Sequence, residues 1–388
     1  IALDKALSDI KENKAFISAL VYGVTEKKIT LDYFIDKYAQ GRIKPKVRIV
    51  LWLGAYQLLF MDKVPSSASI NESVKLVKEI KQDYYSKLVN AVLHKIDNDR
   101  QIPDDLSVKY SVPENLINMW KKQYGEDVLN EFLPCINDKP PLFAIPNKKF
   151  VNSDELLYEL ECDGILGEAY DEFVLIENAN DLTASKAFKN GLFYIEDLSS
   201  FNCANALDAL SDDLVLDMCS APGGKAFTIS QSMNNSGKIY CYDLHEHRLN
   251  LIKSSAKRLS IDNIYTDVND ATVYNENIPK ADKILCDVPC SGFGIIRRKP
   301  EIRYKDLDSV KDLPQIQYKI LETSSRYLKD GGRIIYSTCT LNKKENENVV
   351  NKFLKDHSGY KLLKEKTVFP STVGGDGFYY AIMVKNEN

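Results

Sequence analysis

Two cysteines stand in settings that a buried structural cysteine does not need. Cys290 lies in DVPCSG (287–292) and Cys339 in STCTL (337–341), and each follows a strand-like segment. If these two strands are neighbours in a parallel sheet, their carboxyl ends lie at the same pocket. A thiolate suits attack on carbon 6 of a pyrimidine, after which carbon 5 can accept a methyl group if an acid such as Asp287 supports ring nitrogen 3. One cysteine can then attack while the other assists release, and spacing alone does not rank them.

A second group of residues predicts an adenosine-containing ligand. The stretch LVLDMCSAPGGKAF (214–227) places Asp217 at a strand end, followed by a loop with Gly223 and Gly224 and then a helix. At the end of the next strand, Asp243 is placed to bind ribose hydroxyls, and Asp270 closes a third strand. The loop fits neither G-x-G-x-x-G nor the phosphate loop, and a single strand-end aspartate can simply cap a helix. Because three such acids follow successive strands, an adenosine-containing ligand is favoured over three helix caps.

The elements around these residues predict three domains. Residues 1–103 carry apolar residues at helical spacing, with Pro65 separating two helices, and indicate an all-helical bundle. Residues 104–198, after the polar segment DNDRQIPDD, mix short strands and helices as a small α+β domain. From residue 199 the strands DLVLDM, GKIYCYD, ADKILCDV and GGRIIYST alternate with helices. This alternation predicts a doubly wound α/β sheet over 199–388, with ligands at the carboxyl ends of its strands.

Charge and composition limit the possible partners. The 388 residues carry a formal net charge of −4, so any nucleic acid must be bound by local patches. One such patch, IIRRKPEIRYK, follows Cys290 directly, and we expect Arg297, Arg298, Lys299 and Arg303 to contact RNA phosphates there. A solvated charged loop is the alternative interpretation.

Cysteine and histidine usage indicates the compartment and the metal content. The eight cysteines form no C-x-x-C pair, which is typical of a reduced cytoplasmic protein, and the four histidines lack the neighbours of a metal site. The apolar run VRIVLWLGAYQLLFM is short for a membrane span and predicts a buried helix. We therefore expect no metal and no membrane contact, and a monomer.

The motifs resemble those of a known family. DMCSAPGGK, CDVPCSG, YSTCTL, ENENVV and DGFYYA together resemble the Nop2/Sun class of RNA cytosine-5 methyltransferases, whose methyltransferase domain is Rossmann-like. The N-terminal stretches LGAYQLLFMDKVPSSASINESVKLVK and KLVNAVL are similar to the NusB-like domain of the RsmB branch, whose substrate is bacterial 16S rRNA. Together the matches cover most of the chain.

The resemblance implies roles for particular residues. It implies S-adenosylmethionine as cofactor, Cys339 as the nucleophile and Cys290 as the residue that aids release. It further implies a cofactor site lined by strand-end acids and the glycine loop, with Lys225 near the cofactor carboxylate. These residues are Cys219, Ser220, Ala221, Pro222, Gly223, Gly224, Lys225, Asp243, Asp270 and Asp287.

Several features depart from the family pattern or leave alternatives open. Thr340 follows Cys339 where serine is usual, Glu196 stands in place of glutamine, and His94 in place of arginine. In Ala144-Ile145-Pro146 an arginine expected before the asparagine is missing, which puts one RNA contact in doubt. A tRNA or another rRNA position is an alternative substrate, and an inert RNA-binding assembly factor is an alternative function. Methylation of a protein or small molecule would need no attacking thiol.

Overall fold

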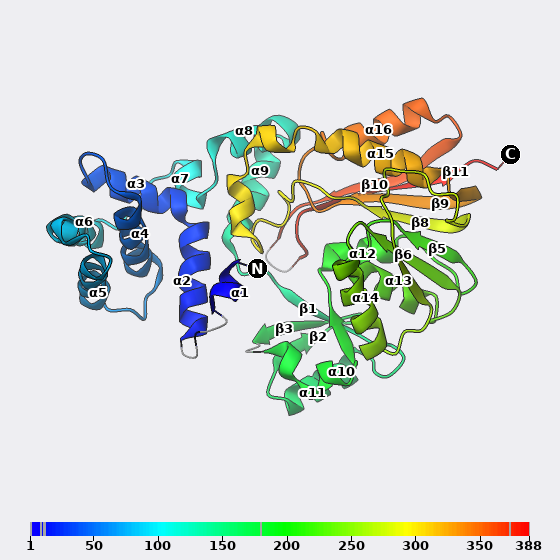
Figure 1. Cartoon of the computed structure of the whole chain (residues 1–388), viewed down its shortest axis with the longest axis horizontal. Helices are drawn as coiled ribbons and strands as arrows, with labels where there is room; N and C mark the ends of the chain where they lie inside the picture. The colour runs from blue at the N-terminus through cyan, green and yellow to red at the C-terminus, as the bar shows by residue number, and fades with distance from the viewer. Residues whose placement is uncertain (1, 8–9, 11–12, 179–180, 372–373, 388) are drawn as a thin grey trace. The chain divides into compact units, whose positions relative to one another are not determined.

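The computed structural model describes residues 2–7, 10, 13–178, 181–371 and 374–387. The chain forms two compact units (Figure 1). The helical unit comprises residues 1–137 and 299–304, and the sheet unit comprises residues 138–298 and 305–388. The segment 299–304 therefore belongs to the helical unit although the residues on both sides of it belong to the sheet unit.

The helical unit is built from short and medium-length helices. They are α1 (Ala2–Leu7), α2 (Lys14–Glu26), α3 (Lys28–Tyr38), α4 (Pro45–Phe60), α5 (Ser66–Glu79), α6 (Ser86–Asn98), α7 (Leu106–Tyr110), α8 (Glu114–Tyr124) and α9 (Glu126–Phe132), with 3₁₀ turns η1 (Asp83–Tyr85), η2 (Leu133–Asn137) and η4 (Pro300–Tyr304). The all-helical fold predicted for residues 1–103 is confirmed, whereas α7, α8 and α9 lie in the segment that was predicted to mix strands and helices.

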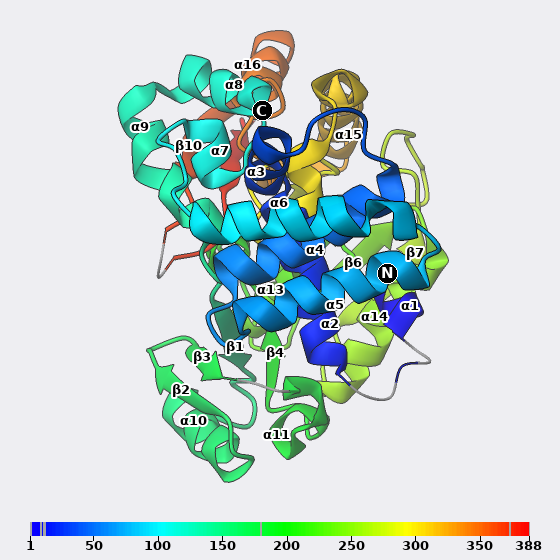
Figure 2. The same ribbon diagram turned by 90° about the vertical axis from the view of Figure 1, so that its left-hand side faces the viewer.

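Close packing of α4, α5 and α6 gives the helical unit its core. These three helices lie side by side (Figure 2), and their buried faces include Val50, Ile70 and Leu93. Gly54 allows the close approach, because a Cβ atom there would lie 2.6 Å from the hydroxyl oxygen of Ser73. The run predicted to be a buried helix is α4, and no helix among the described residues is long and apolar enough to cross a membrane.

A small antiparallel sheet opens the sheet unit. Its strands are β1 (Leu142–Pro146), β2 (Leu166–Ala169), β3 (Val174–Asn178) and β4 (Phe193–Ile195), in the order β2-β3-β1-β4, accompanied by α10 (Ser153–Cys162), η3 (Leu182–Ala184) and α11 (Lys186–Lys189). The three-domain division at residues 103 and 198 stays a prediction. The two compact units group its middle segment differently, since α7 to η2 belong to the helical unit and this sheet to the other.

A seven-stranded sheet forms the rest of the sheet unit, in the order β10-β11-β9-β8-β5-β6-β7. The strands are β5 (Leu214–Asp217), β6 (Lys238–Asp243), β7 (Ile264–Val268), β8 (Ala281–Asp287), β9 (Leu328–Thr338), β10 (Tyr360–Val368) and β11 (Phe378–Lys385); the helices are α12 (Leu198–Asn205), α13 (Gly224–Ser232), α14 (Glu246–Arg258), α15 (Leu313–Ser325) and α16 (Glu347–Asp356), with η5 (Leu307–Val310).

Helices cover both faces of this sheet (Figure 1). Val215 of β5 packs into a core with α13 and α14, whereas Leu216, the next residue, packs into a second core with α15 and α16. Successive strand residues point to opposite faces, so a continuous apolar strand suits a sheet that is buried on both sides.

The order of the strands places the candidate residues together, at the carboxyl ends of the parallel strands. The chain runs from β5 outward to β6 and β7, then returns to β8 on the other side of β5. Strands β5 to β9 are parallel, so the loops after β5, β6, β8 and β9 leave the same edge of the sheet. The predicted α/β fold is confirmed, with the difference that β11 runs antiparallel to both of its neighbours, β9 and β10, and makes the sheet mixed.

Candidate active site

The loop after β5 forms one wall of a cavity of about 390 Å³. Within the loop, the Ser220 hydroxyl donates to Asp217 Oδ2 at 2.6 Å, and the Ser220 amide donates to the Tyr242 carbonyl of β6 at 2.8 Å. Gly223 has a φ of +109°, a conformation that favours glycine, and α13 begins at the next residue. The loop therefore leads along the cavity wall into the start of α13, where the N-cap residue Gly223 offers no side-chain cap.

Two carboxyl groups in the cavity wall are buried. Burial raises the pKa of Asp217 and of Glu196 to about 7 in each case. Asp217 Oδ1 has no hydrogen-bond partner within the part of the chain that the structure describes. Glu196 Oε2 accepts from the Thr228 hydroxyl at 2.5 Å. The sequence marked Glu196 only as a departure from the family pattern, whereas the structure makes it part of the cavity.

Asp243, at the end of β6, is fixed by its neighbours. Its side chain is 3% exposed, pairs with Arg248 at 3.0 Å and accepts from the amide of His245. Arg248 also donates to the Ala221 carbonyl at 2.7 Å, so it joins the end of β6 to the loop after β5. This link is absent from the sequence prediction, because an exposed arginine in a helix gives no sign of its partners.

Asp270 has a different environment from the other strand-end acids. Its carboxylate accepts from the amide and the hydroxyl of Thr272, at 2.9 and 2.7 Å. These are the bonds of a local turn. Asp270 therefore stabilises a turn between β7 and β8 and caps no helix, and its contact with a cofactor stays a prediction.

An ion pair connects the cavity to the loop after β8. Lys225 lies 2.8 Å from Asp287 and donates to the Ser200 hydroxyl at 3.1 Å. Burial lowers the pKa of Lys225, but the carboxylates of Asp287 and Glu196 outweigh it, and the pKa lies above its usual range. The Ser337 hydroxyl at the end of β9 donates to Asp287 Oδ1 at 2.8 Å. Asp287 therefore touches both the cavity and the strand that leads to Cys339.

The two candidate cysteines lie together. The Sγ atoms of Cys290 and Cys339 are 3.1 Å apart, and both residues are half-buried as free thiols. The contact with Cys339, together with burial, raises the pKa of the Cys290 thiol well above its usual value. The structure thus brings together three residues that the sequence placed at strand ends, Asp287, Cys290 and Cys339.

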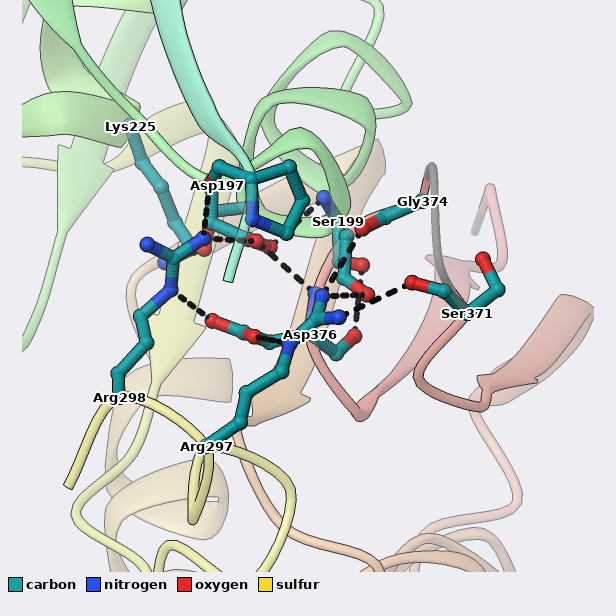
Figure 3. A network of polar contacts seen from close by, with 11 residues as sticks. Asp197, Ser199, Lys225, Arg297, Arg298, Ser371, Gly374 and Asp376 are labelled. Carbon is teal, nitrogen blue, oxygen red and sulfur yellow. Dashed lines mark hydrogen bonds and ion pairs between the residues drawn. The ribbon is translucent and has the colours of Figure 1, made fainter. Parts of the chain in front are cut away.

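The cationic run after Cys290 is placed differently from the prediction. Arg297 is 6% exposed, and its guanidinium pairs with Asp376 at 2.6 Å (Figure 3). It also donates to the backbone carbonyls of Ser371, Gly374 and Gly375. Arg298 also pairs with Asp376 and lies 3.2 Å from Asp197, with 27% of its side chain exposed. Burial is the first cause of a raised pKa at Asp376.

Arg303 is buried in the helical unit, with 1% exposure. Its Nη1 donates to the carbonyls of Glu26 and Ser111 at 2.9 and 3.0 Å. The expectation that Arg297 and Arg303 contact RNA phosphates does not fit this placement, because both guanidinium groups are buried inside the protein. Lys299 is exposed. A run of charges in a sequence does not reveal which of them have buried partners.

The departures from the family pattern can also be located. Ala144-Ile145-Pro146 lies in β1, and the following Asn147 is buried and donates to the carbonyls of Gly191 and Leu259. His94 is exposed on α6. Thr340 keeps a hydroxyl in place of that of serine, and it lies 2.7 Å from the hydroxyl of Ser291. The described residues hold no group of three or more His, Cys, Asp or Glu side chains arranged to bind a metal.

The residues present fit a nucleoside cofactor with a charged amino-acid end. A carboxylate with an open acceptor, a lysine and a glycine loop line one cavity, and an aspartate suited to a ribose closes the neighbouring strand. Solved structures with this fold include a methyltransferase homologue from Pyrococcus horikoshii, with 26% identity, a TM-score of 0.63 and coverage of 72% of this chain and 98% of that one. Fold and site define an S-adenosylmethionine-dependent methyltransferase.

Comparison with known families makes the assignment specific. Residues 204–384 match the model described as 16S rRNA methyltransferase RsmB/F, and residues 2–98 match the NusB family. The probable ribosomal RNA small subunit methyltransferase B of Bacillus subtilis is 34% identical over 98% of this chain and 92% of its own length. The Synechocystis protein of the same description is 30% identical, over 93% and 86%. The chain belongs to the ribosomal RNA small subunit methyltransferase B family.

The likeness to solved structures extends over nearly the whole chain. The crystal structure of PH0851 has a TM-score of 0.82 and 28% identity, and covers 98% of this chain and 93% of that one. NSun6 from Pyrococcus horikoshii, at 20% identity and a TM-score of 0.65, shares the fold over 71% of this chain and 99% of that one.

Proposed function

We propose that the protein methylates carbon 5 of a cytosine in 16S rRNA through a transient bond between Cys339 and carbon 6 of the base. The observation that carries the proposal is the pair of thiols 3.1 Å apart, next to a carboxyl group that also lines the cofactor cavity. A methyltransferase that acts on a nitrogen or on a protein has no use for two such thiols.

The proposed reaction assigns each residue one task. The Cys339 thiolate adds to carbon 6, and Asp287, protonated or sharing a proton with the bound base, supports ring nitrogen 3 as charge develops there. The Lys225 ammonium, 2.8 Å from Asp287, holds that carboxyl group in place. When bound, S-adenosylmethionine supplies an electrophilic methyl group to carbon 5. A water molecule then takes the proton from carbon 5, and the electron pair of that C–H bond restores the double bond between carbons 5 and 6. The bond between Cys339 Sγ and carbon 6 breaks in the same step, and the sulfur leaves as a thiolate. Cys290, in contact with that sulfur, assists this release.

The pKa of the Cys290 thiol supports the order of the two roles. The raised pKa of Cys290 keeps that thiol protonated near neutral pH, so it is a poor nucleophile. The resemblance to the Nop2/Sun class, in which the cysteine of the T-C motif attacks, points the same way. Cysteine 339 is therefore assigned to attack and Cys290 to release.

Ribosomal RNA as substrate rests on the family. The relatives from Bacillus subtilis and Synechocystis are described as small-subunit rRNA methyltransferases, and they match this chain over nearly its whole length. A cytosine stacked in a helix does not reach a thiol, so the target lies in a loop or is flipped out. Exposed Lys299 is the residue of the cationic run best placed to meet a phosphate.

The decisive experiment incubates the protein with labelled cofactor and small-subunit rRNA and maps 5-methylcytosine. We expect label on one cytosine of 16S rRNA with the wild type and none with Cys339→Ala. The matched control is Cys162→Ala, an exposed cysteine on α10. Label on tRNA alone would favour the alternative substrate, and no label on any RNA would favour an assembly factor.

The second cysteine gives an independent test. We expect Cys290→Ala to leave a protein–RNA adduct that survives denaturation, because attack proceeds and release does not. Gel electrophoresis under denaturing conditions detects it. If the variant forms no adduct while the wild type methylates, the assignment of the two roles is wrong.

A further inference from the structure

The motif ENENVV follows the Cys339 loop and has no task in the reaction proposed above. Its first two residues, Glu345 and Asn346, have no exposed surface. Each places a polar side chain in the interior, where it requires hydrogen-bond partners. Those partners are the residues that flank the two cysteines.

Glu345 holds the loop that carries Cys290. Its Oε2 accepts from the backbone amide of Ser291 and from the Gln317 side chain, both at 2.9 Å. Its Oε1 accepts from the Ser291 hydroxyl at 2.6 Å and from the Asn342 side chain at 2.8 Å. Gln317 also donates to the carbonyl of Pro289 at 3.0 Å. The residues before and after Cys290 are thereby fixed to one buried carboxylate.

Asn346 holds the loop that carries Cys339. The Thr338 hydroxyl donates to Asn346 Oδ1 at 2.6 Å, and Asn346 Nδ2 donates to the Thr340 carbonyl at 2.9 Å. The residues on both sides of Cys339 are therefore bound to one amide. Residues 345 and 346 are adjacent in the chain, so neighbouring side chains of one segment hold the two cysteine loops.

A chain of hydroxyl groups connects the two halves. The Ser291 hydroxyl has one hydrogen, which it gives to Glu345, so at the 2.7 Å contact the Thr340 hydroxyl is the donor. Thr340 Oγ1 in turn accepts from the amide of Phe293 at 3.2 Å. The Ser291 hydroxyl points to Glu345 and the Thr340 hydroxyl points to Ser291, so the orientation of both hydroxyl groups depends on the Glu345 side chain.

We propose that Glu345 and Asn346 form a clamp of positioning residues, in which Glu345 sets Cys290 for the release step and Asn346 sets Cys339 for attack. The inference rests on the proposed function, since it assigns the two halves of the clamp to the two steps of that reaction. Neither residue touches the reacting atoms.

The test for Glu345 uses Glu345→Gln. Four donors converge on the two oxygens of the carboxylate. The glutamine side chain has nearly the same volume, but an NH₂ group that donates replaces one of these acceptor oxygens, so the hydrogen bonds to the Cys290 loop are lost. We expect turnover of 16S rRNA to fall by about 10- to 100-fold and a denaturation-resistant adduct to accumulate, as with Cys290→Ala. Glu347→Gln, the same change two residues along with its carboxylate near Thr367, serves as the control and forms no excess adduct.

The test for Asn346 uses the Cys290→Ala background, in which attack is measured alone. We expect Asn346→Leu to reduce the adduct formed there by about 10-fold or more, because Thr338 and Thr340 lose their common partner. Glu345→Gln in the same background leaves adduct formation within about threefold. The opposite pattern, with Glu345→Gln lowering the adduct as much as Asn346→Leu, overturns the division of roles.

Folding of each variant is checked by its thermal unfolding transition. If Glu345→Gln does not fold, Gln317→Met is used in its place. This variant removes the hydrogen bonds from Gln317 to the Pro289 carbonyl and to Glu345 Oε2. We expect it to form the same adduct at a lower level. If the wild type forms no 5-methylcytosine, the proposed function fails. If the wild type and Cys290→Ala behave as proposed but folded Glu345→Gln turns over like Glu347→Gln without an adduct, only the clamp is refuted.

Discussion

At the scale of single residues, the buried carboxyl group of Glu196 makes stability depend on pH. Its pKa is about 7 in the folded protein, raised from 4.5 first by burial, and the Lys225 ammonium only partly offsets this. A folded pKa above the unfolded one means that folding favours the protonated form. The contribution of Glu196 to the stability of the folded state is therefore fully present below about pH 4.5 and is lost as the pH rises through about 7.

We expect Glu196→Gln, which mimics the protonated group, to stabilise the protein most at alkaline pH. The gain should grow from below about 1 kcal/mol at pH 5 to about 3 kcal/mol at pH 8, since one pKa unit corresponds to about 1.4 kcal/mol. Urea unfolding at the two pH values measures it. Glu131→Gln on the exposed face of α9 is the control. An equal effect of Glu196→Gln at both pH values would refute the burial argument.

The residues of the site differ in how far a sequence can predict them. Cys290 and Cys339 were placed together because each follows a strand and parallel strands end at one edge. The burial of Arg297 was not predicted, because its partner Asp376 lies 79 residues further along the chain. The sequence marks Glu345 and Asn346 as part of the ENENVV motif but does not predict their contacts, because partners such as Ser291 and Gln317 lie far away in the chain.

At the scale of elements, two glycines let three loops meet at the site. The Gly294 amide donates to the Cys339 carbonyl at 3.1 Å, and the Gly377 amide donates to the Gly294 carbonyl at 2.9 Å. A Cβ atom on Gly294 would lie 2.0 Å from the Gly377 carbonyl oxygen and 2.8 Å from that of Cys339. Backbone atoms at such distances cannot be avoided by a change of rotamer, so a side chain at residue 294 must displace a loop.

We expect Gly294→Ala to lower methylation by at least about tenfold and to destabilise the protein by about 1–3 kcal/mol through overpacking. Formation of 5-methylcytosine and urea unfolding give the two values. Gly359→Ala is the matched control, because a Cβ atom there meets nothing within 4 Å. If both variants are equally active and stable, the close contact does not position Cys339.

The strands of the sheet were predicted in part. The apolar strands between helices were recognised from their alternation with helices, but β10 and β11 were not. Most of β10 is polar and exposed, with the sequence YKLLKEKTV, and its regular form depends on antiparallel pairing with β11 along its length. A pattern search for buried parallel strands does not find an edge strand whose stability comes from its neighbour.

At the scale of the whole molecule, the chain passes from the sheet unit to the helical unit and back within eight residues. Arg298 and Lys305 belong to the sheet unit, whereas the six residues between them belong to the helical unit. Lys305 donates to the Ser291 carbonyl, next to Cys290, at 2.7 Å. Composition and periodicity divide a sequence into consecutive segments, so they do not predict a segment that returns to an earlier unit.

Arg303 and Lys299 allow a test of this topology, because the two cations of the inserted segment have opposite environments. We expect Arg303→Met to destabilise the protein by about 2–4 kcal/mol, since the carbonyls of Glu26 and Ser111 lose their buried donor. The salt dependence of RNA binding should stay unchanged, because a buried guanidinium releases no counterion. Lys299→Met, at an exposed position, should leave unfolding unchanged and reduce the salt slope by about 1. A reduced slope with Arg303→Met would instead return that arginine to the RNA surface and contradict its placement in the helical unit.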